Sequence, residues 1–115
     1  HPLKRQIQAA EHIFGVFGKV ASLLAPDKPD REALQAQRQK LAAALADGGR
    51  PPFMAAPDLE RRYRGFLKQA EIYAELFDQG LNEEFYAPLR FEMNKTAVAS
   101  RTAYNDFVRD ANKMR

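Results

Sequence analysis

The stretch that decides the fold covers residues 3–24 and reads LKRQIQAAEHIFGVFGKVASLL. Apolar side chains recur along it in alternating steps of four and three residues, at positions 3, 7, 10, 14, 17, 21 and 24. This spacing is typical of one face of an α-helix that packs in a bundle. A second apolar row lies beside the first, at Ile13, Val16, Val20 and Leu23. We therefore predict a helix over residues 3–25 whose second half is the most deeply buried.

Two glycines, Gly15 and Gly18, lie within this first helix. Each destabilises a helix interior by roughly 1 kcal/mol relative to alanine. Their presence three residues apart therefore suggests that another group approaches the backbone closely. We favour a neighbouring helix as that group, and the alternative is a small apolar ligand held between helices.

The two segments that follow predict a short turn, a second helix and a long loop. Residues 25–30 contain two prolines and two aspartates that could cap a helix, so we expect a second helix over residues 29–46. Its only large apolar side chains are Leu34, Leu41 and Leu45, which predicts a peripheral position. Residues 47–57 carry three prolines and two glycines and predict the longest loop.

The second half of the chain predicts two longer helices. The four-three spacing resumes over residues 58–79, and Gly80 suits the left-handed conformation that ends a helix. A fourth helix is predicted over residues 83–113, with a kink or a restart near Pro88. Helices of similar length joined by short links favour an all-α fold, an antiparallel bundle of about four helices. The length of 115 residues predicts a single domain over 1–115.

Composition excludes several kinds of function. The absence of cysteine removes disulfides, thiol catalysis and thiolate metal sites. No Glu-x-x-His pair, phosphate-binding loop or nucleophile motif occurs, so we expect no catalytic residues, no metal and no cofactor. The apolar run over residues 13–25 is shorter than the roughly 20 residues that a membrane span requires. Cytoplasmic, periplasmic and secreted locations all remain compatible with the sequence.

The predicted third helix has an unusual order of charges. Basic side chains come first, at Arg61, Arg62, Arg64 and Lys68, and acidic side chains come last, at Glu71, Glu75 and Asp78. This order opposes the helix dipole at both ends, so a helix selected only for stability would reverse it. We interpret the basic cluster as a candidate binding surface.

A binding surface built on this cluster would include apolar residues of the long loop. The candidate contacts are Arg61, Arg62, Arg64, Lys68, Phe53 and Met54. Such a surface suits a partner protein with an apolar centre and an acidic rim. Phe91 falls off the apolar stripe of the fourth helix, so we expect it to be exposed and able to anchor a partner or a second copy of the chain.

The leading hypothesis is therefore a non-enzymatic helical-bundle module that binds another protein. The alternative is binding of a small apolar ligand or lipid between helices, with Gly15 and Gly18 providing room. Nucleic-acid binding through the Arg61–Arg64 cluster comes third, because 18 basic residues against 15 acidic ones give little excess positive charge. Contact of residues 13–25 with a membrane surface and formation of a homodimer are further alternatives.

Overall fold

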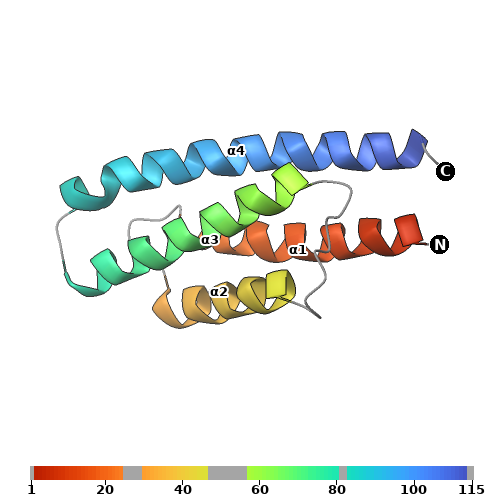
Figure 1. Ribbon diagram of the computed structural model, residues 1–115. Helices are drawn as coiled ribbons and strands as arrows, with labels where there is room; N and C mark the ends of the chain where they lie inside the picture. The colour runs from red at the N-terminus through yellow and green to blue at the C-terminus, as the bar shows by residue number, and fades with distance from the viewer. Residues whose placement is uncertain (1, 25–29, 47–56, 81–82, 114–115) are drawn as a thin grey trace.

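The computed structural model describes residues 2–24, 30–46, 57–80 and 83–113. These residues form four α-helices, shown in Figure 1. They are α1 (Pro2–Leu24), α2 (Arg31–Ala46), α3 (Pro57–Asp78) and α4 (Glu83–Lys113). Every end lies within two residues of its predicted position, and the prediction of an all-α antiparallel bundle is confirmed.

Successive helices run in opposite directions, and the start of α1 lies at the same end of the bundle as the end of α4 (Figure 1). α1 packs against α2 and α4, and α3 packs against the same two helices. α1 and α3 touch along the diagonal of the bundle, whereas the described parts of α2 and α4 do not meet. The bundle is elongated, with principal extents of 50 × 25 × 18 Å. α2 and α4 therefore each contact two helices, whereas α1 and α3 each contact three.

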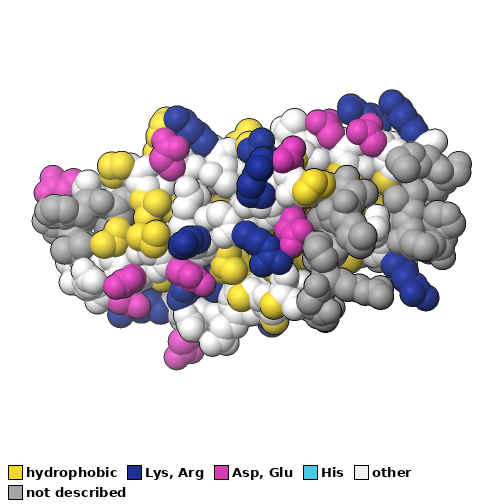
Figure 2. Space-filling model, viewed as in Figure 1, with side chains coloured by type: hydrophobic (Ala, Val, Ile, Leu, Met, Phe, Trp, Pro, Cys, Tyr) yellow, Lys and Arg dark blue, Asp and Glu magenta, His cyan; other side chains and the backbone are white. Residues whose placement is uncertain are grey.

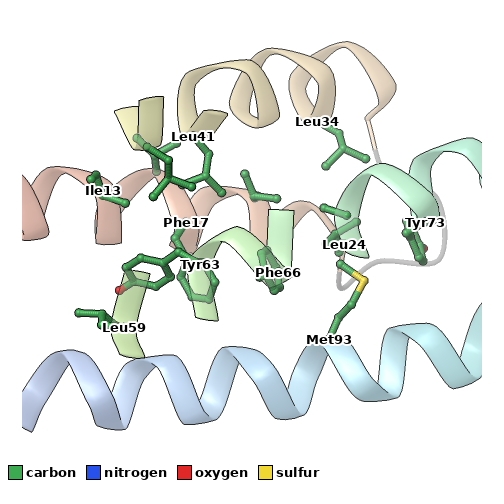
Figure 3. Close-up of a cluster of buried hydrophobic side chains, with 14 of the residues drawn as sticks. Ile13, Phe17, Leu24, Leu34, Leu41, Leu59, Tyr63, Phe66, Tyr73 and Met93 are labelled. Carbon is green, nitrogen blue, oxygen red and sulfur yellow. The ribbon is translucent and has the colours of Figure 1, made fainter. Parts of the chain in front are cut away.

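The core is built around aromatic rings from α1, α3 and α4. The ring centroid of Phe17 lies 4.6 Å from that of Tyr63 and 4.5 Å from that of Phe66. One turn earlier, Phe14 stacks face to face on Tyr104 of α4, with centroids 4.1 Å apart and planes 5° from parallel. Figure 3 shows Phe17, Tyr63 and Phe66 pointing toward one another between the helices. These contacts join three of the four helices.

α2 adds a leucine row to this core and begins at a defined cap. Its buried residues are Leu34, Leu41 and Leu45, as predicted. Asp30 accepts a hydrogen bond at Oδ1 from the backbone N–H of Ala33, over 3.1 Å. This interaction satisfies one of the N–H groups that a helix start leaves without an intrahelical partner. It also explains why α2 begins at Arg31 and not at residue 29.

The second half of the chain contains a glycine cap and an uninterrupted last helix. Gly80 has a positive φ of 70°, and its N–H donates to the carbonyl of Phe77 over 3.0 Å. The cap predicted for α3 is therefore confirmed. α4 continues through Pro88 as one helix, without a restart. Because Pro88 lies only five residues after the helix start, the backbone hydrogen bond that it removes is confined to the first turns.

The prediction that Gly15 and Gly18 mark a close approach is wrong. Both glycines lie on the exposed side of α1, opposite the buried row. A Cβ atom added to either one would have no described neighbour within 4 Å. Neither glycine therefore admits a second helix of the bundle or makes room for a ligand. Within the described bundle, both glycines therefore only lower the stability of α1.

Replacing these glycines with alanine should stabilise the protein. We expect Gly15→Ala and Gly18→Ala each to raise the free energy of unfolding by about 0.5–1 kcal/mol, since alanine restricts the unfolded chain and meets no obstacle. Urea denaturation followed by circular dichroism measures the change. Gly80→Ala is the control and should destabilise, because alanine tolerates a φ of 70° poorly. A loss of stability in Gly15→Ala or Gly18→Ala would contradict this account.

Candidate functional site

The four basic side chains predicted as a contact surface do not form one patch. All four lie exposed on α3. Because consecutive helical residues are rotated by about 100°, Arg62 and Arg64 point roughly 160° apart around the helix axis. Figure 2 also shows basic and acidic side chains interspersed over the visible face of the bundle. Arg61, Arg64 and Lys68 fall within roughly 60° of one another around the helix axis, and Arg62 faces away from them.

Arg64 has a structural role at the boundary between α3 and α2. Its Nη2 donates to the backbone carbonyl of Leu45 over 2.5 Å. The same guanidinium group pairs with Glu60, with Nη2 2.7 Å and Nε 3.1 Å from Oε1. Leu45 lies in the last turn of α2, where carbonyl groups lack intrahelical partners. Arg64 therefore ties the start of α3 to the end of α2.

Two charges of α3, one toward each end, are favourable for its antiparallel neighbour. The start of α3 lies beside the end of α2, where the dipole of α2 is negative, so the Arg64 charge is favourable there. At the other end, Asp78 of α3 pairs with Arg31 in the first turn of α2, with Nε and Oδ1 3.3 Å apart. The order that is unfavourable within α3 is thus favourable for α2. These contacts account for Arg64 and Asp78 without a binding partner.

The other predicted contact residues divide into three groups. Arg61 pairs with Asp58 of its own helix, with Nη2 and Oδ1 2.5 Å apart. Arg62 and Lys68 make no ion pair with a described residue. Phe53 and Met54 lie outside the described residues, so their part in a contact surface stays a prediction.

Removal of the Arg64 side chain should destabilise the bundle, whereas removal of the Arg62 side chain should not. We expect Arg64→Ala to lower the free energy of unfolding by about 1 kcal/mol, because it removes charged hydrogen bonds to Leu45 and Glu60. The value stays modest because the Arg64 side chain is 52% exposed and water competes for it. Arg62→Ala should change stability by less than about 0.5 kcal/mol. Equal urea midpoints for the two variants would contradict a structural role for Arg64.

Among the side chains that the structure describes, the most exposed large apolar ones lie on the outward face of α4. Phe91 is 61% exposed and Val98 is 68% exposed. They lie seven residues apart on one face, directly opposite the buried Met93 and Ser100. Lys95 lies between them, with its ammonium nitrogen 4.6 Å from the centroid of the Phe91 ring. The predicted exposure of Phe91 is confirmed, whereas sequence reasoning missed Val98, whose position two turns after Phe91 was the available signal.

The described residues line two open grooves between helices. One, of about 550 Å³, lies between α2 and the end of α3 and includes Arg31, Phe77 and Asp78. The other, of about 470 Å³, lies between α1 and α2. Its lining residues are Ala9, His12, Ile13, Val16, Lys40, Ala43 and Ala44. The second groove is a candidate ligand site that the sequence analysis did not locate, because it does not involve Gly15 or Gly18.

The described residues contain no arrangement that would support catalysis by a metal. No group of three or more His, Cys, Asp or Glu side chains that could hold a metal ion occurs among them. Burial raises the pKa of the Tyr63 hydroxyl far above its ordinary value, and Tyr104 raises it further. Burial and the Glu11 carboxylate likewise raise the pKa of Tyr104. Both phenols therefore stay protonated at neutral pH and are not poised as bases.

None of the helices in the described ranges combines the length and apolar character needed to cross a membrane.

Comparison of the chain with protein-family models, with curated proteins and with solved structures finds no match.

Proposed function

We propose that this chain is a non-enzymatic helical-bundle module that binds another protein, and that the outward face of α4 supplies the centre of the contact. The observation that carries the proposal is the exposure of Phe91 and Val98 on one helix face. Single exposed apolar residues are ordinary on protein surfaces. Two of them on the same face, about 10 Å apart along the axis, form a pair of anchors.

The surroundings of these anchors suit a protein interface. Lys95 between them pairs with Glu92, with Nζ and Oε1 3.4 Å apart, and both side chains are more than half exposed. Further along the same face, Arg109 pairs with Asp106. The two anchors therefore lie among polar groups of both signs, which resembles the apolar core and polar rim of protein interfaces.

This surface replaces the arginine cluster as the proposed contact. Arg61 and Arg64 are engaged with Asp58 and with Glu60 and Leu45, so their charges serve the fold. Nucleic-acid binding through the same cluster loses support for the same reason. A phosphate-binding surface needs basic groups that gather on one side and are available to phosphates.

The test removes the two anchors and leaves the fold intact. We expect immobilised wild-type chain to enrich a specific protein from native lysate, and Phe91→Ser/Val98→Ser to lose it. Ile72→Ser is the matched control, because Ile72 is 46% exposed on α3 and lies away from the proposed face. Mass spectrometry identifies the captured proteins. Circular dichroism and urea denaturation should show the three chains equally folded, because the substituted residues are exposed.

Two outcomes would contradict the proposal. One is capture of the same proteins by the double variant and by the wild type. The other is a wild-type chain that enriches nothing from the lysate of its own source. Loss of the partner in Ile72→Ser alone would move the contact to α3.

A further inference from the structure

We propose that the groove between α1 and α2 binds an aliphatic carboxylate, a single-chain amphipathic anion. The groove is separate from the outward face of α4, so this site is independent of the proposed protein contact. Its volume of about 470 Å³ falls in the range of small-molecule sites. Five of its seven lining residues are apolar.

Small side chains on both helices create the groove. α2 presents Ala43 and Ala44, and α1 presents Ala9 beside the larger Ile13 and Val16. Packed helices keep their axes about 8–10 Å apart, and alanines are too short to fill the surface between them. The result is an apolar channel that is open along one side. A flexible hydrocarbon chain lying in it would cover apolar surface that the bundle leaves to water.

The polar residues of the groove define the charge of the ligand. The two lining residues that are not apolar are His12 and Lys40, and both are exposed. No acidic side chain lines the groove, and neither His12 nor Lys40 forms an ion pair with a described residue. A carboxylate would give Lys40 an opposite charge, while the aliphatic stem of Lys40 packs along the hydrocarbon chain.

The groove between α2 and α3 differs from the α1–α2 groove in the charges that line it. Its cation Arg31 pairs with Asp78 and lies over the ring of Phe77, 4.9 Å from the centroid. A second cation, Arg38, and a second carboxylate, Glu32, also line that groove, so its lining carries charges of both signs. The basic side of the α1–α2 groove has no such internal counter-charge among the described residues, and this difference selects it as the anion site.

The first experiment tests charge selectivity with probes of equal chain length. Decanoate and decyltrimethylammonium, each below its micelle concentration, are titrated into the whole chain by isothermal calorimetry. We expect saturable binding of decanoate and at least ten-fold weaker binding of the cation. Lys40→Gln should lower the affinity for decanoate by about five-fold, which is the upper limit expected from one exposed ion pair. Lys19→Gln, an exposed lysine outside the groove, should leave the affinity within two-fold.

The second experiment fills the groove. Ala43 is exposed, so Ala43→Phe places a ring in the channel without entering the core, and we expect it to abolish decanoate binding. Ala36→Phe is the matched control, because Ala36 is exposed on the same helix but does not line this groove. Thermal melts verify that both variants fold. The proposal is overturned if decanoate does not bind saturably, if the cation binds equally well, or if either Lys40→Gln or Ala43→Phe keeps wild-type affinity.

Discussion

The packing of Phe17 is the interaction on which the rest of the bundle depends. Its ring contacts Tyr63 and Phe66 of α3, and its neighbour Phe14 stacks on Tyr104 of α4. One turn of α1 thereby fixes the positions of two other helices. Aromatic pairs stabilise beyond the area that they bury, because their geometry is specific. The cluster therefore determines how the helices pack as well as how strongly they pack.

α2 is held in a different way, and this difference explains the charges and the grooves. Three leucines attach it to the core, and polar contacts with α3 hold its two ends, through Arg64 at Leu45 and through Asp78 at Arg31. Because its remaining surface is largely alanine and polar residues, it leaves open grooves against both neighbours. α4, in contrast, packs fully on one side and presents Phe91 and Val98 on the other.

Much of the fold could be predicted from the sequence because helix periodicity is a local property. The four-three spacing located α1 and α3, and the turn residues Asp30 and Gly80 marked ends that the structure confirms. The candidate site could be predicted only in part: the apolar stripe of α4 placed Phe91 outside the core, whereas the role of Arg64 depends on which helix ends meet. The hydrogen bond of Arg64 to Leu45 could not be predicted locally, because the end of α2 lies 19 residues earlier in the sequence. Gly15 and Gly18 were misinterpreted although both fall outside the two apolar rows of α1, and this periodicity already indicated the exposed side.

The unfolding free energy of Phe17→Ala tests the central claim most directly, with Phe91→Ala as a matched phenylalanine control. Urea denaturation of the two variants and the wild type supplies the three values. Because the Phe17 ring packs on Tyr63 and Phe66, we expect Phe17→Ala to lower the free energy of unfolding by about 3–5 kcal/mol, or to give a chain that no longer unfolds cooperatively. Phe91→Ala should change the value by less than about 0.5 kcal/mol. A Phe17→Ala variant within about 1 kcal/mol of the wild type would contradict the account, since a fully buried phenylalanine removed from such a junction leaves a cavity.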